Sequence, residues 1–111
     1  MLTTFGPTPA DLLDFYEACG LRTVEGWGTR ECTGLCTLNP LDLPRRGSVG
    51  RAVPGVDVVV FGGRCLRTRG PHVCLGYLGA DGGTTSACDD DGWLTVHGDA
   101  RMDAQGYAWL S

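Results

Sequence analysis

No lysine occurs in this sequence, because all nine of its basic residues are arginine. Without a lysine amine, the chain cannot itself carry Schiff-base chemistry or any other reaction that depends on that group. Long apolar runs are also absent, since no stretch approaches the roughly 18 consecutive apolar residues of a transmembrane helix. Residues 1–10 have neither the basic nor the apolar region of a secretory signal. The sequence therefore predicts a cytoplasmic protein without a transmembrane span.

The cysteine pattern lacks the spacing of a metal site. Six cysteines occur, but no C-x-x-C pair, and the two histidines, His72 and His97, do not complete a zinc pattern. In a protein without a secretory signal, such cysteines are by default reduced thiols that act as small core hydrophobes. A secreted module stapled by disulfide bridges is the alternative interpretation.

Charge and glycine content limit the class of protein. The formal net charge is −4, so we expect no nucleic-acid partner, and we interpret the arginines between residues 45 and 69 as a solvated basic face. Glycine makes up 18 of 111 residues, which is about twice its usual share. So much glycine indicates many turns, and hence short strands in a single domain.

The N-terminal part predicts a helix followed by a strand. Gly20 provides a C-terminal stop, so we expect a helix over Pro9–Cys19 with Thr8 as its N-cap. The apolar positions at helical spacing are Leu12, Leu13, Phe15, Tyr16 and Cys19. Residues 1–7 are interpreted as an unstructured lead-in, and Leu21–Val24 as a short strand.

The C-terminal part predicts short antiparallel strands. Gly62-Gly63 is a two-residue hairpin signal, and residues 32–46 and 79–91 are interpreted as irregular loops. The expected strands are Val56–Phe61, Arg64–Arg69, Val73–Leu78, Trp93–His97 and Tyr107–Leu110. The overall prediction is an α+β fold, with a helix–strand–loop part over 1–46 and a small antiparallel β subdomain over 47–111.

Residues 25–34, with the sequence EGWGTRECTG, have the greatest density of binding chemistry. Their glycines allow backbone N–H groups to approach a ligand closely, because no Cβ intervenes. The aromatic ring offers a flat face, and the carboxylates offer hard oxygens to a cation. A glycine-rich turn after a strand is also where open α/β sheets bind ligands. A plain tight turn is the alternative interpretation.

Six motifs follow one another along the chain. They are residues 27–31 (WGTRE), 47–55 (GSVGRAVPG), 69–71 (RGP), 76–77 (GY), 92–99 (GWLTVHGD) and 103–107 (DAQGY). In this order and spacing they resemble the acyl-adenylate-forming (AMP-binding) synthetase superfamily, and its fatty acyl–CoA ligase branch in particular. The resemblance implies a fragment that covers the end of the large N-terminal domain of such an enzyme.

The resemblance assigns roles to individual residues. Trp27 stands in the place of the family's tyrosine, whose ring lies against adenine. Glu31 matches the acid that helps to hold Mg²⁺ at the phosphates, and Asp99 matches the acid that accepts hydrogen bonds from both ribose hydroxyls. The predicted nucleotide-binding residues are Glu25 and Gly26 (through their backbone), Trp27, Gly28, Glu31 and Asp99, with Glu31 as the metal ligand. No residue is assigned as catalytic.

The implied activity is that of an acid–CoA ligase. In the family, a carboxylate attacks the α-phosphate of ATP to give acyl-AMP and pyrophosphate, and the thiol of CoA then displaces AMP. ATP or AMP, Mg²⁺ and CoA are thus the expected cofactors, and a fatty acid is the expected substrate. The family's phosphate loop and catalytic lysine are missing from the sequence, so we expect a fragment that is inactive alone. The alternatives are a non-catalytic nucleotide-binding or interaction module and one half of a split enzyme.

Two departures from the family motifs carry further expectations. Arg30 replaces a threonine of the loop, and residues 94–97 are one residue longer than the family's spacing. One extra residue turns the following side chains to the other face of a strand unless a bulge absorbs it. We also expect Leu21–Val24 to have lost its parallel neighbours and to present unpaired edges, which a partner chain supplying the rest of the domain would cover.

Overall fold

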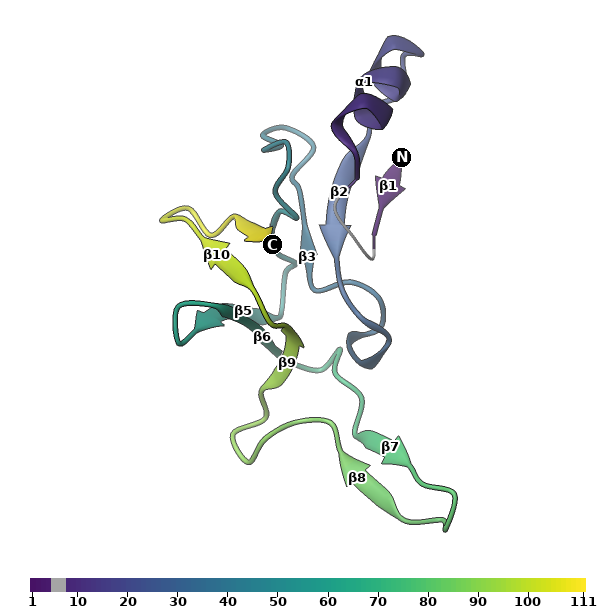
Figure 1. The fold of residues 1–111 in the computed structure, drawn as a ribbon, viewed down its shortest axis with the longest axis vertical. Coiled ribbons are helices and arrows are strands. Elements are labelled where there is room, and N and C mark those ends of the chain that lie inside the picture. Colours follow the sequence, from purple (N-terminus) through teal and green to yellow (C-terminus); the bar gives the residue numbers. More distant parts are fainter. Residues whose placement is uncertain (5–7) are drawn as a thin grey trace.

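The computed structural model describes residues 1–4 and 8–111. The molecule is elongated, with principal extents of 51 × 31 × 24 Å. Helix α1 (Ala10–Ala18) lies at one end, and the hairpin of β7 (Gly76–Leu78) and β8 (Thr84–Ser86) lies at the other (Figure 1). Within the described residues α1 is the only α-helix, and the short strands form four small sheets that are antiparallel except for the β1–β2 pair. The predicted α+β class is therefore confirmed.

The N-terminal elements form a β–α–β unit. Strands β1 (Leu2–Thr3) and β2 (Val24–Trp27) pair in parallel, and α1 connects them. The predicted helix is confirmed, although Pro9 rather than Thr8 occupies its N-cap. The prediction of an unstructured lead-in is wrong for β1, and its positions 5–7 lie outside the described residues.

The strand predicted over Leu21–Val24 is wrong in position, because pairing partners and not local composition decide where a strand forms. β1 pairs with the first two residues of β2, and β3 (Thr37–Leu38) pairs with the last two. The expectation that the strand has lost its parallel neighbours is therefore wrong, because β1 is one; β1 and β3 lie on opposite edges of β2, and each pairs with two of its residues. β4 (Arg51–Ala52) completes the sheet in the order β1-β2-β3-β4. β3 also corrects the prediction that residues 32–46 are irregular throughout.

The second sheet contains the predicted hairpin. β5 (Asp57–Phe61) and β6 (Cys65–Arg69) are antiparallel, and β9 (Leu94–His97) pairs with the other edge of β6. Gly62 and Gly63 have φ values of 60° and 77°. Positive φ at both glycines is what a tight hairpin turn requires, so the predicted hairpin is confirmed, but Phe61 pairs with Cys65, so its loop has three residues, Gly62–Arg64, and not two.

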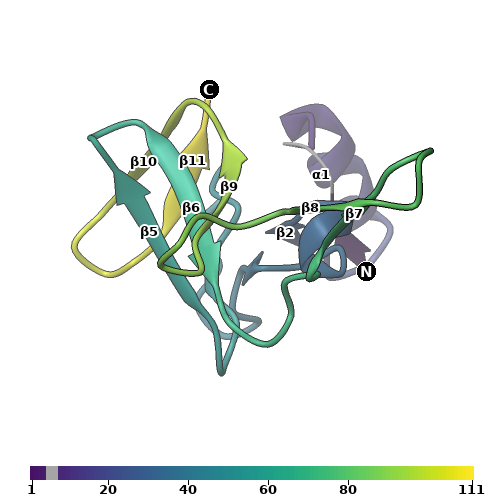
Figure 2. The ribbon, with the colours of Figure 1, turned by 90° about the horizontal axis from the view of Figure 1, so that it is seen from below.

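Two further hairpins contain strands that the sequence did not indicate. β8 lies within residues 79–91, which were predicted to be a loop, and its exposed polar residues have no alternating pattern. β10 (Ala100–Met102) pairs with β11 (Ala108–Leu110), and only the second of these was predicted. Seen from below (Figure 2), β5, β6, β9, β10 and β11 gather on one side of the molecule, and α1 and β2 lie on the other.

A small core joins the sheets and includes two thiols. Its buried members are Cys32, Cys36, Val49, Leu66, Leu94, Val96, Ala100 and Ala108. The prediction that cysteines serve as core hydrophobes is confirmed for the first two. All six cysteines are free thiols, which argues against the disulfide-stapled alternative. No helix in the described part of the chain has the length and apolar character needed to cross a membrane.

Candidate functional site

Residues 25–34 fold into a closed loop at the end of β2. After Trp27 the chain makes a short 3₁₀ turn over Arg30–Cys32 and reverses through Thr33 and Gly34. These last two residues have φ values of 57° and 86°, which lie in the left-handed region. The loop is therefore a compact turn held in a defined conformation.

Gly28 is required by the closure of this loop. The Cys36 N–H donates to the Trp27 carbonyl at 2.7 Å and brings the two ends of the loop together. A Cβ on Gly28 would lie 2.4 Å from the Leu35 nitrogen and 2.5 Å from the Gly34 carbonyl carbon. Any side chain at this position would thus collide with the returning backbone. This close approach of the backbone explains why position 28 is a glycine, and no bound ligand is needed for that explanation.

Glu31 lines a pocket of about 320 Å³ together with Arg30, Cys74 and Tyr77. The Tyr77 hydroxyl donates a hydrogen bond to Glu31 Oε1 at 3.1 Å. The Cys74 N–H donates to the Glu31 carbonyl at 2.7 Å. The loop is therefore joined to the start of the β7–β8 hairpin at the position where the sequence predicts a metal ligand.

The Glu31 carboxylate is held in its ionised form. Hydrogen bonding from the Thr29 hydroxyl, followed by the loop backbone and Tyr77, lowers the pKa of Glu31 below its ordinary value, and the Arg30 charge adds to this effect. Arg30 is exposed and forms no ion pair with any side chain in the described part of the chain. The pocket thus presents a hard anionic oxygen beside a guanidinium that can form bidentate bonds with an anion.

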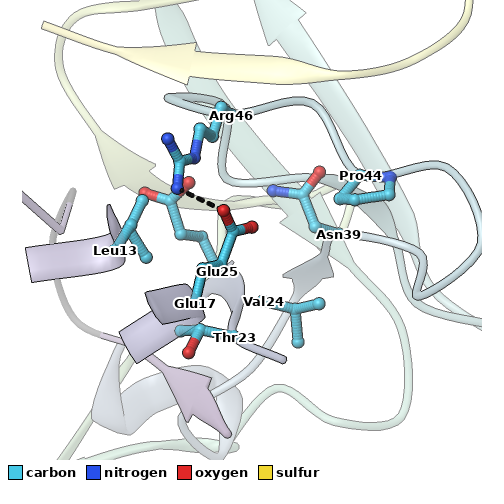
Figure 3. A pocket seen from close by; sticks show the side chains of 8 residues that line it. All are labelled: Leu13, Glu17, Thr23, Val24, Glu25, Asn39, Pro44 and Arg46. Carbon is cyan, nitrogen blue, oxygen red and sulfur yellow. Dashed lines mark hydrogen bonds and ion pairs between the residues drawn. The ribbon is translucent and has the colours of Figure 1, made fainter. Parts of the chain in front are cut away.

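Glu25 lies away from the Glu31 pocket, and its hydrogen bonds hold the fold together. Its side chain is 4% exposed and accepts the Thr8 N–H at 3.3 Å and the Gly47 N–H at 3.1 Å, one on each oxygen. Beside it lies a cavity of about 360 Å³ between α1 and the β2–β3 region, where Arg46 reaches Glu17 (Figure 3). The Glu25 carboxylate therefore fixes two chain segments to β2.

Gly26 and Trp27 are engaged by the sheet and the core. Gly26 pairs with Leu38, and a Cβ on it would lie 2.8 Å from the Thr37 carbonyl oxygen. Trp27 is half-buried and packs against the core cluster. The Glu25 carbonyl accepts the Asn39 N–H at 2.8 Å, so the backbone of this strand is bonded into the fold.

The stretch 94–97, which is one residue longer than in the family, contains a β-bulge that accommodates the extra residue. The β6–β9 register shifts between Leu66, which pairs with His97, and Arg67, which pairs with Thr95. Beyond the bulge, Asp99 accepts hydrogen bonds on Oδ1 from Arg64 Nε at 3.1 Å and Nη2 at 2.8 Å. This contact places Asp99 at the end of the β5–β6 hairpin.

The three predicted acids therefore do not share one pocket in the described part of the chain. Glu25 bonds to Thr8 and Gly47, Glu31 to Tyr77, and Asp99 to Arg64. Among groups of histidine, cysteine, aspartate and glutamate in the described residues, no set of three or more is placed to hold a metal ion. Glu31 differs from the other two in that its pocket also holds a guanidinium, that of Arg30, which forms no ion pair with any described side chain.

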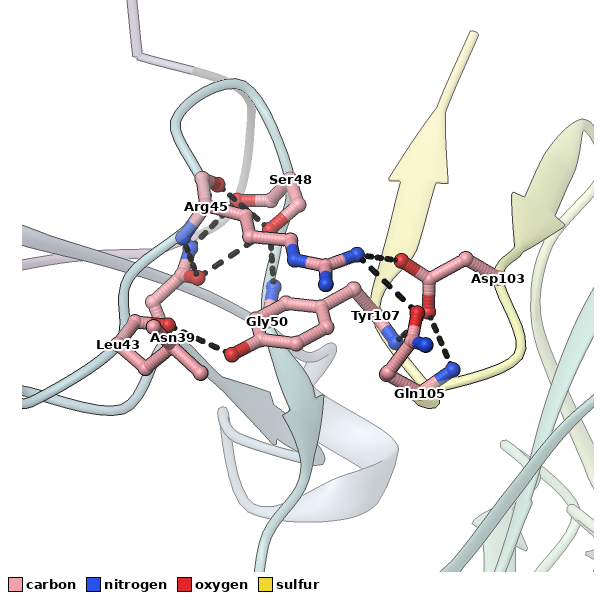
Figure 4. Close-up of polar contacts among 8 residues, drawn as sticks. All are labelled: Asn39, Leu43, Arg45, Ser48, Gly50, Asp103, Gln105 and Tyr107. Atoms are coloured by element: carbon pink, nitrogen blue, oxygen red, sulfur yellow. Dashed lines mark hydrogen bonds and ion pairs between the residues drawn. The ribbon is translucent and has the colours of Figure 1, made fainter.

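The motif over residues 47–55 begins in a buried polar network that was not predicted (Figure 4). The Asn39 side chain is buried, donates to the Ser48 carbonyl at 2.7 Å and accepts the Arg45 N–H at 2.9 Å. The Ser48 hydroxyl donates to the Arg45 carbonyl at 2.7 Å and accepts the Gly50 N–H at 3.3 Å. These bonds shape the turn that leads into β4.

The motif over residues 103–107 is structural for a related reason. The Tyr107 side chain is 1% exposed, and its hydroxyl donates to the Leu43 carbonyl at 2.6 Å. The Arg45 guanidinium lies over its ring, 4.3 Å from the centroid, and pairs with Asp103. Asp103 also accepts the Tyr107 N–H at 2.9 Å, which closes the turn between β10 and β11 (Figure 4).

Cys32 and Cys36 form a coupled pair of buried thiols beneath the loop. A hydrogen bond from Cys36, with help from the Thr29 backbone N–H at 3.1 Å, lowers the pKa of Cys32 to about 5. The same bond raises the pKa of Cys36 above its ordinary value, and burial adds to the effect. The Cys32 sulfur is thus the acceptor of the pair, with Cys36 as its principal donor and the Thr29 backbone N–H as a second donor. Sequence spacing alone did not indicate this pair.

Comparison with solved structures identifies the fold. The chain matches MenE from Escherichia coli with a TM-score of 0.84 and 21% identity, over 98% of this chain and 24% of that one. It also matches the N-terminal domain of FACL13 from Mycobacterium tuberculosis with a TM-score of 0.78 and 25% identity, over 99% of this chain and 31% of that one. The fold is thus that of one segment of an adenylate-forming CoA synthetase.

Sequence comparison leads to the same group of enzymes. A protein of M. tuberculosis named as fatty-acid–CoA ligase fadD11 is 31% identical over 106 residues, and a long-chain-fatty-acid–CoA ligase of Yersinia pestis is 39% identical over 100. These matches cover 96% and 79% of this chain but only 19% and 17% of the two relatives. No family model matches the chain. The resemblance to the adenylate-forming ligases, and to their fatty acyl–CoA ligase branch, is therefore confirmed, and the chain corresponds to about a fifth of the length of such relatives.

Proposed function

We propose that this chain is a nucleotide-site segment of an ATP-dependent acid–CoA ligase and that it does not complete the reaction by itself. The observation that carries the proposal is the Glu31 pocket, in which an ionised carboxylate bonded to Tyr77 lies beside Arg30, a cation that forms no ion pair with any side chain the structure describes. It occurs in a segment whose relatives are named as fatty-acid–CoA ligases and whose fold matches a structure of MenE from Bacillus subtilis in complex with ATP and magnesium ion.

The residues present fit Mg²⁺ only together with nucleotide phosphates. Glu31 offers one carboxylate as a hard oxygen ligand, and the described residues supply no second acid beside it. Mg²⁺ is commonly held by one or two carboxylates, with water and substrate phosphates completing its shell. Once bound, the ion would offset charge that shifts between the phosphates during transfer. Glu31 would hold the ion, and Arg30 would contact a phosphate oxygen through its forked N–H groups.

For the rest of the nucleotide, the proposal assigns the ring of Trp27 to the base and the carboxylate of Asp99 to the ribose. Trp27 is half-buried at the end of β2, directly before the Glu31 turn. Asp99 would exchange the bonds from Arg64 for bonds from ribose hydroxyls, which both residues' exposure permits. Glu25, Gly26 and Gly28 support the site by holding β2 and its loop in place.

The overall reaction proposed for the complete enzyme is acid–CoA ligation. A carboxylate oxygen of a fatty acid forms a bond to the α-phosphorus of ATP as pyrophosphate leaves, and the CoA thiol then displaces AMP. This chain contains no lysine, so any step that needs a lysine amine falls to another segment or polypeptide. Six free thiols agree with a reducing compartment, and we place the protein in the cytoplasm on that basis.

Calorimetric titration with ATP in the presence and absence of Mg²⁺ tests the proposal. We expect binding that strengthens when Mg²⁺ is added, and a Glu31→Gln variant that loses this Mg²⁺ effect. Glu17→Gln, which alters an exposed acid on α1, is the matched control and should bind as the unmodified chain does. Equal binding by the chain and Glu31→Gln under both conditions would contradict the assignment. Pyrophosphate exchange by the isolated chain with a fatty acid would contradict the proposed inactivity.

A further inference from the structure

Cys32 and Cys36 lie on the two sides of the turn that closes the loop after β2. Between them the chain reverses through Thr33 and Gly34, whose φ values are 57° and 86°. Both cysteines are 0% exposed and belong to the same core cluster. Their sulfurs share a hydrogen bond, with Cys36 as the donor. Two thiols are thus packed against each other beneath the loop that carries Glu31.

The backbones of the two cysteines are held in different ways. The Cys36 N–H donates to the Trp27 carbonyl at 2.7 Å, and the Cys36 carbonyl accepts the Val53 N–H at 3.1 Å. Cys36 is therefore fixed to β2 and to the segment that follows β4. Cys32 is bonded within its own loop, where its N–H donates to the Thr29 carbonyl at 3.2 Å. A change that draws the two sulfurs together should thus move Cys32 and its loop rather than Cys36.

The Cys32 sulfur holds Thr29 in position. It accepts the Thr29 N–H at 3.1 Å, donates to the Thr29 carbonyl at 3.4 Å, and lies 3.7 Å from the Thr29 hydroxyl. The same hydroxyl donates a hydrogen bond to the Glu31 carboxylate. Thr29 therefore connects the buried thiol pair to the candidate metal ligand.

A disulfide between the two cysteines would break this connection. A covalent S–S bond is about 2.05 Å long, which is much shorter than a hydrogen-bonded contact between two thiols. Because Cys36 is fixed on both sides, the Cys32 sulfur would leave its position beside Thr29. It would also lose the S–H that bonds to the Thr29 carbonyl. Disulfides in reducing compartments are usually transient and catalytic or redox-sensing, so the pair is suited to reversible oxidation.

We propose that Cys32 and Cys36 form a modification site, in which a peroxide oxidises the two thiols to a disulfide and so releases Thr29. Burial selects the oxidant: hydrogen peroxide is little larger than water, whereas the mixed disulfide that a bulkier reagent forms has no room in a close-packed core.

The oxidation takes place in two steps. The Cys32 sulfur forms a bond to one peroxide oxygen as the O–O bond breaks, and the departing hydroxide takes the thiol proton and leaves as water. This step gives a sulfenic acid. The Cys36 sulfur then bonds to the Cys32 sulfur, and the hydroxyl leaves with the Cys36 proton as a second water. Two thiols thus lose two electrons, and one peroxide is reduced to two waters.

The test treats the full 111-residue chain with hydrogen peroxide and maps its cysteines by mass spectrometry. Trypsin cleaves after arginine, so the peptide of residues 31–45 contains Cys32 and Cys36 and no other cysteine. We expect this peptide to lose two hydrogen atoms and to regain them in dithiothreitol. Cys36→Ser should prevent the loss. Cys19→Ser, which alters an exposed thiol on α1, is the matched control and should leave it unchanged. Oxidation of Cys19 while peptide 31–45 keeps both thiols would overturn the proposal.

Amide hydrogen exchange tests the release of Thr29. In the oxidised chain the Thr29 N–H should exchange about tenfold faster or more, because its sulfur acceptor has moved away. The Cys36 N–H, which is bonded to the Trp27 carbonyl, should keep its rate and is the internal control. Dithiothreitol should restore slow exchange at Thr29, and this reversal needs no variant that might fail to fold. Unchanged exchange at Thr29 in the disulfide form would overturn the proposal.

The consequence for the nucleotide rests on the proposed function. Hydrogen-bonded partners of a ligating carboxylate typically contribute 10- to 100-fold to metal affinity, so release of Thr29 should reduce the Mg²⁺-dependent gain in ATP binding by about tenfold or more. An undiminished gain in the oxidised chain would overturn this consequence. The mass and exchange measurements need no nucleotide. A chain that binds no ATP would therefore contradict the proposed function, whereas failure of the disulfide to form would contradict the modification site.

Discussion

The Tyr77 hydroxyl donates a hydrogen bond to the Glu31 carboxylate across 46 positions of sequence, at a distance of 3.1 Å. This bond joins the loop that follows β2 to the β7–β8 hairpin, which otherwise extends away from the body of the molecule (Figure 1). Together with the Cys74 N–H bond to the Glu31 carbonyl, it makes the position of the hairpin depend on the candidate ligand residue. The pocket and the hairpin therefore form one structural unit.

The first prediction concerns the ionisation of Glu31. Thr29→Val and Tyr77→Phe each remove a donor, so both should raise the pKa of Glu31, with the larger change in Thr29→Val because that hydroxyl contributes most. Carbon-detected NMR titration of the Glu31 carboxyl measures the pKa directly. Since the pKa is lower in the folded state, the bonds stabilise the fold above the unfolded pKa, and this contribution is lost as the pH falls through the folded pKa. An unchanged titration in both variants would contradict the contacts.

The second prediction concerns Gly50, which lies against β3. It has a φ of 85°, and a Cβ would lie 2.0 Å from the Leu38 carbonyl carbon. Gly50→Ala should lower the free energy of unfolding by about 3 kcal/mol or more. The β3 backbone would have to move away from the new Cβ, and the alanine would also have to adopt a strained φ. Gly47→Ala is the matched control: its φ is 76° but nothing lies within 4 Å of the added Cβ, so only about 1 kcal/mol of conformational strain applies. Urea unfolding measures both, and equal losses would refute the steric explanation.

Local patterns predicted the elements that local chemistry determines. Gly62-Gly63 imposed its hairpin, and Gly20 ended the helix, because positive φ at a glycine needs no distant partner. The strand before the loop was misplaced, and β8 and β10 were missed, because a two- or three-residue strand exists only where a neighbour pairs with it.

The candidate site could likewise be predicted only where local sequence determines it. Glu31 was identified by its motif, but its bond to Tyr77 is a tertiary contact that no local pattern contains. The burial of Glu25 between Thr8 and Gly47 could not be foreseen either, since those donors come from two distant segments. The sequence thus identified the motif, and the fold showed that the Glu25 carboxylate is bonded to two backbone N–H groups whereas the Glu31 carboxylate is bonded to a side-chain hydroxyl at a separate pocket.

The third prediction concerns Tyr107, whose hydroxyl bonds to the Leu43 carbonyl at 2.6 Å. Tyr107→Phe should lower the free energy of unfolding by about 1–2 kcal/mol, because a carbonyl that the tyrosine satisfies is left without that donor. Tyr16→Phe is the control, since the Tyr16 ring lies half-buried on α1, and it should change stability by less than about 0.5 kcal/mol. Equal effects in urea unfolding would show that the hydroxyl at position 107 contributes nothing specific.

The last prediction concerns the charge of the Cys32–Cys36 pair. The pKa of Cys32 is lowered to about 5, chiefly by the Cys36 hydrogen bond, so one thiolate should form near pH 5 while an ordinary thiol titrates near about 8.5. Absorbance at 240 nm detects this step. Cys36→Ala should move the step to higher pH, because it removes the principal donor, whereas Cys19→Ala, which alters an exposed thiol on α1, should leave it in place.

The same titration has a consequence for stability. Because the folded pKa of Cys32 lies below the unfolded one, the free energy of unfolding should rise as the pH increases from about 5 towards the unfolded pKa, and this gain should shrink in Cys36→Ala. Urea unfolding at several pH values measures the slope, with Cys19→Ala again as the control. If the 240 nm absorbance stays flat below pH 7 in the unmodified chain, both thiols are neutral, and the loop donors at Thr29 do not hold a charge.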